Sequence, residues 1–440
     1  MITQILDKID SVMYYPILII VMALAGIYFT ILTKGVQIRL FPESVRLLKE
    51  PPEDKKNVSS LQAMLVSTAS RVGTGNIIGV STAICLGGPG AVLWCWLTGV
   101  FGISTKYAEA LLAVKYRVKD RNGNMHGGPM YSLLRGLGWR YMAIIFSIFT
   151  VIASMGIGNM VQCNAITMLC YENFQIPEWQ SSAVVALLAA IVILGGVKSI
   201  ARICTAFVPI MALLYVLGCI YILIVNAQYL IPSLQLILQS AFSPRSAVSG
   251  MVGGGIMMAA RYGIARGLFS NESGMGSAPI VAAAARTRNI HRQALISSTG
   301  TFWDTVVVCA MTGLVVVTSV LAHHDIDYSA GAALTHAAFS TIPYIGTPLL
   351  LFGITTFAFS TILGWSYYGE KGIEFLAGTR SRFLYRIIYV LITFLGGIMP
   401  LTFVWDFSDL ANGLMCIPNL LCLLALSGVI VRETRKANLL

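Results

Sequence analysis

Arg71-Val72-Gly73-Thr74-Gly75-Asn76-Ile77-Ile78-Gly79 interrupts a long apolar segment that runs from Ser60 to Leu86. A plain lipid-facing helix would not carry three glycines and an asparagine at its centre. Glycine frees a backbone to unwind, and the unwound amides and carbonyls of a membrane helix can hold an anion and a cation. The spacing of Gly75 and Gly79 also fits a simpler interpretation, in which the glycines only let a neighbouring helix pack closely. Both interpretations place this stretch inside a membrane-spanning helix.

The composition of the whole chain indicates a protein embedded in lipid. Of its 440 residues, 56% are hydrophobic and only 11% are charged, which is too apolar for water-soluble domains of this length. Apolar stretches of about 20 residues, the length that crosses a bilayer, recur about eleven times between Tyr15 and Val431. Because these runs are continuous and do not alternate, the sequence predicts an all-α polytopic membrane protein of about 11 transmembrane helices rather than a barrel.

The basic residues report topology rather than a nucleic-acid surface. The formal net charge is +11, yet the basic side chains lie at the ends of apolar segments without interleaved aromatic residues that would stack on bases. Only Lys8 precedes the first apolar segment, whereas the loop after it carries six basic residues: Lys34, Arg39, Arg46, Lys49, Lys55 and Lys56. The positive-inside rule therefore predicts an N-terminus outside the cell and a cytoplasmic C-terminus.

A second long apolar segment, Ala247 to Ala285, is interrupted by a polar stretch, Gly267 to Ser277. If the first helix, residues 12–34, is an extra one, the remaining helices form two sets of five at residues 60–226 and 247–431, each opened by an interrupted helix. An odd number of crossings inverts the second set relative to the first. Corresponding broken helices in inverted halves indicate a transport site near the bilayer midplane.

Several polar residues in the apolar segments are candidates for that site. Ser270 and Asn271 are candidates for polar substrate contacts. Asn159 and Gln162 share a helix face at a spacing of three residues, where they could bind a zwitterion or join two helices. Ser360 and Thr361 offer the oxygen ligands that sodium prefers, although such hydroxyls also cap carbonyls within their own helix.

Three charged residues inside the apolar segments also stand out. Asp304 is a lone acid in the predicted eighth helix, and it is either a gating or coupling residue or a hydrogen-bonded structural one. Lys106 and Glu109, three residues apart, are predicted to pair with each other.

The search for enzyme signatures indicates a protein without catalytic activity. The sequence contains no phosphate-binding loop, zinc-protease motif or nucleophile elbow. Its histidines lack metal-ligand spacing, and its nine cysteines lie in or beside apolar runs without a CxxC pair. We therefore expect no cofactor and no ATP-driven pump, and an ion gradient as the source of energy. Neither a channel nor an intramembrane enzyme is excluded by these absences.

Five motifs follow one another along nearly the whole chain: RVGTGNIIGVS at 71–81, GGPG at 87–90, GGPMY at 127–131, RGLFSNESGMGSAP at 266–279 and FAFSTILGWSYYGE at 357–370. They resemble the motifs of the alanine or glycine:cation symporter family, the sodium:alanine symporters, within the amino acid-polyamine-organocation superfamily. The resemblance implies the bacterial leucine-transporter architecture of five-plus-five inverted repeats in the inner membrane. It also implies coupling to sodium, or sometimes to protons, and small neutral amino acids as substrates.

The resemblance also assigns roles to single residues. Thr74, Gly75 and Asn76 would lie in the unwound part of the first core helix, which binds the carboxylate of the amino acid on backbone amides. Sodium would be bound by two carbonyls and two hydroxyls, those of Ala69, Val72, Ser360 and Thr361. Three further side chains would form the wall of the substrate pocket: Gln162, Phe269 and Trp365.

The predicted function is sodium-coupled symport of alanine, glycine or both into the cell by alternating access. The expected partners are a small neutral amino acid, the sodium ion and membrane lipid, without nucleic acid. The oligomeric state is left open. The alternatives are a proton-coupled transporter of small amino acids, and a channel or sensor that binds an amino acid without moving it.

Overall fold

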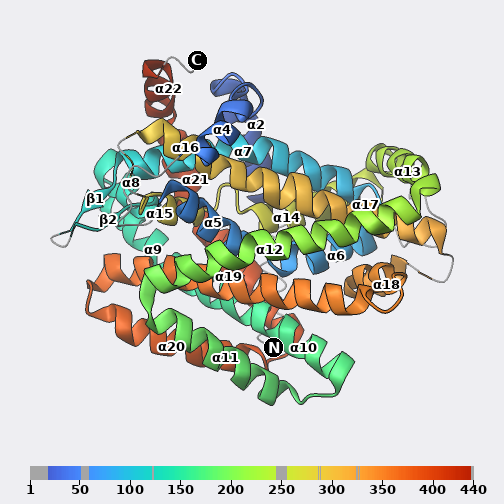
Figure 1. Cartoon of the computed structure of the whole chain (residues 1–440). Helices are drawn as coiled ribbons and strands as arrows, with labels where there is room; N and C mark the ends of the chain where they lie inside the picture. The colour runs from blue at the N-terminus through green and yellow to red at the C-terminus, as the bar shows by residue number, and fades with distance from the viewer. Residues whose placement is uncertain are drawn as a thin grey trace.

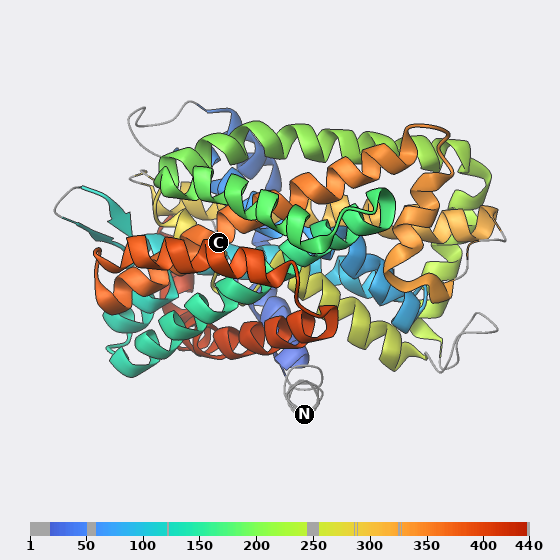
Figure 2. The same ribbon diagram turned by 90° about the horizontal axis from the view of Figure 1, so that it is seen from below.

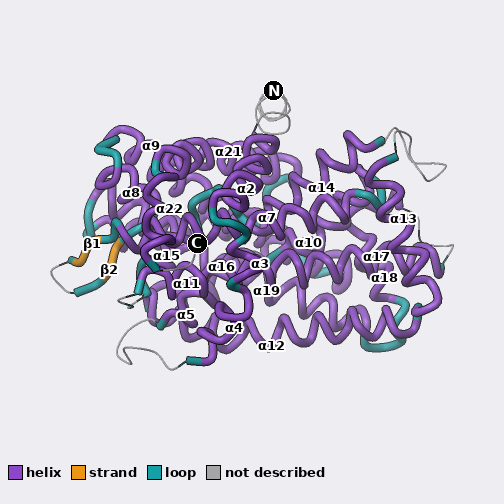
Figure 3. The backbone as a smooth tube through the Cα atoms, turned by 90° about the horizontal axis from the view of Figure 1, so that it is seen from above, coloured by secondary structure: helices purple, strands orange, loops and turns teal. Residues whose placement is uncertain are grey.

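The structure is a computed structural model that describes residues 18–50, 59–120, 123–243, 255–285, 287, 289–323, 326 and 328–437. It is almost wholly helical, and its two short strands lie at one end of the molecule (Figure 3). The strands β1 (Val118–Lys119) and β2 (Met125–His126) pair antiparallel. The prediction of an all-α fold is therefore confirmed.

The helices of the first half of the chain, up to the end of α13, are α2 (Ile19–Leu32), α3 (Val36–Arg39), α4 (Phe41–Lys49), α5 (Ser60–Arg71), η2 (Gly75–Gly79), α6 (Val80–Gly87), α7 (Ala91–Lys115), α8 (Pro129–Gly136), α9 (Arg140–Met155), η3 (Gly156–Met160), α10 (Val161–Phe174), α11 (Glu178–Leu194), α12 (Gly196–Val225), η4 (Ala227–Tyr229) and α13 (Leu230–Phe242). Those of the second half are α14 (Ile256–Asn271), α15 (Ala278–Ala282), α16 (Ile290–Thr301), η5 (Phe302–Cys309), α17 (Ala310–Ala322), η6 (Tyr328–Ala333), α18 (Leu334–Ser340), α19 (Gly346–Ala377), α20 (Ser381–Gly396), α21 (Leu401–Ala425) and α22 (Ser427–Lys436).

Five continuous helices of the described residues are long and apolar enough to cross a membrane: Arg140–Phe174, Gly196–Val225, Ile290–Ala322, Gly346–Ala377 and Leu401–Ala425. Shorter apolar helices add Ile19–Leu32, Gly75–Gly87 and Glu178–Leu194. The two interrupted segments are not among the five long helices, because each is divided into helices that are too short to cross a membrane alone. The predicted number of about eleven transmembrane helices therefore stays a prediction.

Both predicted interruptions are breaks in a helix. After α5 the backbone leaves the helical region at Val72, whose ψ is 89°, and regular structure resumes at Gly75. After α14 the chain passes through three positive φ angles, 54° at Glu272, 93° at Gly274 and 82° at Gly276, before α15 begins. Two of these three positions are glycine because a side chain is disfavoured there. Each break exposes backbone groups that need partners inside the protein.

The first break lies in the interior of the helix assembly. The α5 helix packs against α12, α16 and α19, and Figures 1 and 2 show α12 and α19 side by side along the molecule. On the other side, α7 packs against α2, α14 and α16. The two broken helices pack against each other, since α14 contacts η2 and α6, and α15 contacts α5.

The outer helices present aliphatic side chains to the surroundings. On α11, Leu187 and Ile191 are 63% and 66% exposed, and on α12 Ile224 is 68% exposed. In water such a surface would be an aggregation hazard, whereas against hydrocarbon it is the expected outer face of a membrane protein.

The proposed division of the chain at 12–34, 60–226 and 247–431 stays a prediction. Residues 12–17 and 247–254 lie outside the described residues.

Gly364 allows α19 to lie directly against α5. A Cβ atom at this position would lie 2.0 Å from the Oγ atom and 3.0 Å from the Cα atom of Ser70. Because Ser70 precedes the first break, we expect Gly364→Ala to lower the free energy of unfolding by about 1–3 kcal/mol. The thermal unfolding midpoint of the purified protein in detergent measures this loss.

Gly428→Ala is the matched control, since a Cβ atom there would have no neighbour within 4 Å. Alanine also favours the helix, so its midpoint should stay the same or rise slightly. If both variants kept the wild-type midpoint, the close approach of α19 to α5 would be contradicted.

Candidate functional site

Two hydroxyls of α19 face two carbonyls at the end of α5. The Oγ1 atom of Thr361 donates to the carbonyl oxygens of Ala69 at 3.0 Å and Val72 at 3.4 Å. The Oγ atom of Ser360 lies 3.3 Å from the carbonyl oxygen of Ala69. Both hydroxyls also lie within 3.0 Å of the carbonyl oxygen of Phe357 in their own helix. The structure thus brings together the four oxygen donors that were predicted to bind sodium.

Gly73 is the residue that lets these groups approach. A Cβ atom here would lie 2.6 Å from Thr361 Oγ1 and 2.9 Å from Gln162 Oε1. A larger residue would require the side chains of Thr361 and Gln162 to move.

Gln162 reaches into the first break from α10. Its Oε1 atom accepts from the backbone amide of Thr74 at 3.2 Å, and its Nε2 atom donates to the carbonyl of Ile157 at 3.0 Å. Its neighbour on the predicted face, Asn159, donates instead to the carbonyl of Tyr389 in α20 at 2.8 Å. The two amides therefore have different roles, and only Gln162 lies at the break.

A buried polar cluster joins the first break to the second broken helix. Asn76 Nδ2 donates to Asp304 Oδ1 at 2.7 Å, and Ser270 Oγ lies 3.2 Å from both carboxylate oxygens. Thr305 Oγ1 donates to Asp304 Oδ2 at 2.7 Å. The lone acid of the sequence is therefore not isolated, because side chains of η2, α14 and η5 surround it.

Asn271 does not join this cluster. Its Nδ2 atom donates to Thr98 Oγ1 of α7 at 3.2 Å, and its Oδ1 atom accepts from the amide of Ser273 at 2.9 Å. This side chain therefore links the end of α14 to α7 by a hydrogen bond. Asn271 was predicted to contact the substrate, but its side chain does not lie at the first break.

Charged side chains hold the second break. Lys106 Nζ donates to the carbonyl of Glu272 at 2.5 Å and lies 3.2 Å from Glu109 Oε2, so the predicted pairing of Lys106 and Glu109 is confirmed. Glu109 Oε1 accepts from the backbone amides of Gly274 and Gly276, each at 3.1 Å. Both partners of the ion pair are buried. Their charges satisfy backbone groups that have left the helix.

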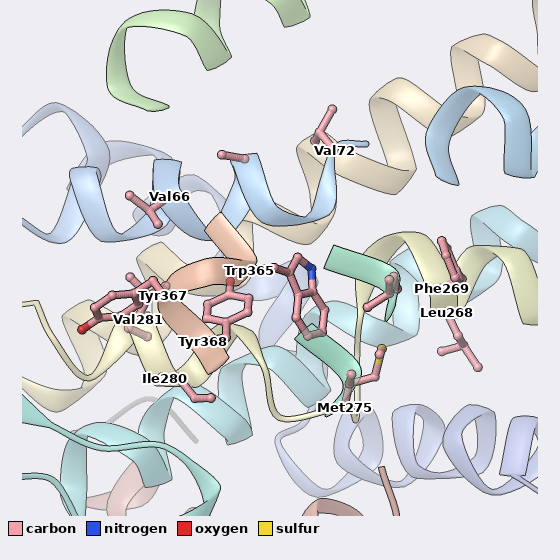
Figure 4. Packing of buried hydrophobic residues seen from close by; sticks show 14 of the residues in the cluster. Val66, Val72, Leu268, Phe269, Met275, Ile280, Val281, Trp365, Tyr367 and Tyr368 are labelled. Atoms are coloured by element: carbon pink, nitrogen blue, oxygen red, sulfur yellow. The ribbon is translucent and has the colours of Figure 1, made fainter. Parts of the chain in front are cut away.

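Trp365 connects the two breaks. Its indole Nε1 atom donates to the carbonyl of Ser70 at 3.0 Å and to Glu272 Oε1 at 2.9 Å. Figure 4 shows the ring at the centre of a buried apolar cluster, between Val72 of the first broken helix and Met275 of the second. A Cβ atom at Gly158 would lie 2.1 Å from the Cβ atom of Trp365. Gly158 in the π-helical η3 therefore makes room for this side chain, a role that was not assigned from the sequence.

Phe269 lies on the other side of the first break. A Cβ atom at Gly75 would lie 3.0 Å from its ring, which also packs on Trp405 with 5.2 Å between centroids. All the predicted site residues are buried. Among the described residues no group of three His, Cys, Asp or Glu residues could hold a metal ion. A cation here would depend on hydroxyl and carbonyl oxygens.

The ion pair of Lys106 and Glu109 provides a test of how the second break is held. Lys106→Met would leave Glu109 as a buried carboxylate without its cation, which should cost about 3–5 kcal/mol of stability. The double variant Lys106→Met, Glu109→Gln removes both charges and keeps an acceptor for the glycine amides. Its unfolding midpoint should recover most of the loss, and a double variant no more stable than Lys106→Met would contradict this account.

The fold resembles that of a known amino-acid-binding transporter. The crystal structure of MhsT in complex with L-phenylalanine superposes with a TM-score of 0.58 and 15% identity, covering 88% of this chain and 98% of MhsT. The likeness shows the leucine-transporter fold. The predicted leucine-transporter fold with two broken helices is thereby confirmed, whereas the bounds of its two five-helix repeats stay a prediction.

Sequence comparison identifies the family. The model of the sodium:alanine symporter family matches residues 1–438. The sodium/alanine symporter AgcS of Methanococcus maripaludis is 43% identical over 99% of this chain and 97% of its own length. The amino-acid carrier protein AlsT of Bacillus subtilis is 37% identical over 92% of this chain and 85% of its own length. The chain therefore belongs to the sodium:alanine symporter family, as the sequence motifs predicted, and is a multi-pass membrane transporter.

Proposed function

We propose that the protein couples the entry of sodium to the uptake of a small neutral amino acid, alanine or glycine, by alternating access. The observation that carries the proposal is the contact of Thr361 with the carbonyls of Ala69 and Val72 across two helices. A helix break whose carbonyls meet hydroxyls of a neighbouring helix is suited to a cation. The name of the relative AgcS, a sodium/alanine symporter, supports the same cation and cargo.

The cation would be bound without a carboxylate ligand. Thr361 and Ser360 now direct their hydroxyl hydrogens at carbonyl oxygens. A bound sodium ion would replace these hydrogens and take the hydroxyl and carbonyl oxygens as ligands, as a hard cation prefers. Both hydroxyls can still donate to the carbonyl of Phe357 in their own helix. The site would thus exchange hydrogen bonds for ion contacts without leaving a donor unpaired.

The amino acid would bind next to this ion, at the amides of the first break. The amide of Thr74 is now covered by the side chain of Gln162. A substrate carboxylate would displace that oxygen and accept from the amides at the beginning of η2, where a helix favours negative charge. Trp365 and Phe269 would limit the size of the side chain. Trp365 also contacts Glu272 of the second break, so it is placed to couple substrate size to the closing of the site.

We further infer that the protein lies in the inner membrane of a bacterial cell. The N-terminus would be outside and the C-terminus cytoplasmic, because the basic loops follow the positive-inside rule. The two repeats would comprise residues 60–226 and 247–431, after the extra helix at 12–34.

Thr361→Ala removes a cation ligand and leaves the amide end of the break unchanged. We expect the sodium concentration for half-maximal alanine uptake in proteoliposomes to rise about tenfold, with a smaller change at saturating sodium. Thr356→Ala is the control, because Thr356 Oγ1 bonds only to carbonyls of its own helix, those of Phe352 and Gly353. If Thr361→Ala kept the sodium activation of the wild type, Thr361 would not be a ligand. Loss of uptake when choline replaces sodium separates symport from a sodium-independent channel or sensor.

Trp365→Phe shortens the wall of the pocket. We expect larger amino acids such as leucine or glutamine to compete with labelled alanine, whereas they should compete weakly in the wild type. The smaller ring leaves more space for the substrate side chain, and without the indole hydrogen bonds the ring is held less firmly in place. Trp179→Phe on α11, where the indole is 58% exposed, is the matched control. An unchanged competition profile for Trp365→Phe would place the size filter elsewhere.

A further inference from the structure

Asp304 lies among hydrogen-bond donors in the interior of the helix assembly. Its side chain is 0% exposed, and its carboxylate lies within hydrogen-bond distance of Asn76 Nδ2, Ser270 Oγ and Thr305 Oγ1. The orientation of the Asn76 amide is fixed, since its Oδ1 atom accepts from the amide of Gly73 and its Nδ2 atom also reaches the carbonyl of Asp304. Asn76 can therefore only donate to the carboxylate, and an ionised carboxylate can only accept.

A continuous chain of hydrogen bonds runs from this carboxylate to the proposed sodium position. Asn76 Nδ2 lies 2.7 Å from Asp304 Oδ1, and Asn76 Oδ1 lies 2.9 Å from the nitrogen of Gly73. That nitrogen belongs to the peptide bond whose carbonyl oxygen, on Val72, accepts from Thr361 at 3.4 Å. Two amides form this series, the side chain of Asn76 and the peptide bond between Val72 and Gly73. In each of them the nitrogen is on the side of Asp304 and the oxygen is on the side of Thr361. Hydrogen bonds in such a chain polarise one another, so the charge on Asp304 makes the carbonyl oxygen of Val72 more negative.

Several buried charged side chains lie near Asp304 and the two breaks. In the centre of the described helices, two buried cations, Arg71 and Lys106, accompany three buried carboxylates, Glu109, Glu272 and Asp304. Lys106 pairs with Glu109. Arg71 donates to Thr301 Oγ1, one turn before Asp304 on the same helix, while its Nη2 atom has no hydrogen-bond partner. Arg266 and Asp409 form a further buried pair nearby, with 3.7 Å between Nη1 and Oδ2.

We propose that Asp304 is the counter-charge of the coupling cation and acts as a positioning residue through Asn76 and the peptide bond between Val72 and Gly73. A zwitterionic amino acid adds no net charge, so the monovalent cation at Thr361 is the charge that the Asp304 carboxylate would attract. The neutral oxygens around Thr361 would then form the cation site, and Asp304 would set its strength without touching the ion. This inference rests on the proposed function, because it requires a cation at Thr361.

The test measures the sodium concentration for half-maximal alanine uptake in proteoliposomes, together with the KM for alanine at saturating sodium. In Asp304→Asn the carboxylate is replaced by a neutral group of the same shape. The sodium requirement should rise at least about tenfold, because an opposite charge at this range in a protein interior is worth that much. The KM for alanine at saturating sodium should change much less. A purely structural role would instead lower the amount of active protein without shifting the sodium requirement.

Thr305→Val is the matched control, because it removes one donor to Asp304 and keeps both the charge and Asn76. Its sodium requirement should stay within about twofold of the wild type. Where Asp304→Asn does not yield folded protein, Asp304→Ser removes the same charge from a smaller side chain and should show the same shift. A sodium requirement unchanged in the neutral variants, or shifted equally in Thr305→Val, overturns the proposal.

These outcomes separate this inference from the function on which it rests. If wild-type uptake does not respond to sodium, the proposed function fails. If the wild type and Thr361→Ala respond as expected while Asp304→Asn keeps the wild-type sodium requirement, only the role of Asp304 fails.

Discussion

A backbone amide or carbonyl that leaves a helix inside a bilayer must find its partner within the protein, because hydrocarbon offers none. Two helices of this chain break in the interior, and the side chains that satisfy the breaks come from other helices. Thr361, Gln162 and Asn76 serve the first break, and Lys106, Glu109 and Asn419 serve the second. The packing of α19 against α5 and of α7 against α14 serves this need.

The two breaks are satisfied by different kinds of groups. The first uses neutral hydroxyls and amides, whose net contribution is about 1 kcal/mol each and which a ligand can replace. The second uses a buried ion pair, and separating one partner from it would cost several times as much. The first break is therefore suited to exchanging bonds with a substrate and an ion, whereas the second is suited to remaining in place. Trp365 donates to both and is a direct contact through which a change at one can reach the other.

Charge is distributed in the same way. The carboxylates that stabilise the interior do not contact the four oxygens facing the proposed cation position, so an ion there would keep weak, exchangeable ligands. Asp304 contacts Asn76 instead, one hydrogen bond away from the peptide of Gly73. An arrangement of this kind lets a fixed charge favour ion entry without holding the ion so tightly that it cannot leave.

The fold class and the positions of both breaks could be read from the chain, because apolar length and clustered glycines are local properties that lipid makes stringent. The motifs also placed Ser360 and Thr361 with Ala69 and Val72, since each is carried by a recognisable stretch. The directions of single side chains could not be predicted this way. Asn159 and Gln162 share a helix face, yet they bond to different helices, and Asn271 points to α7 instead of joining Ser270 beside Asp304. Gly158 and Asp304 acquired their roles only from what lies opposite them, because a contact between residues more than a hundred positions apart depends on how the helices pack.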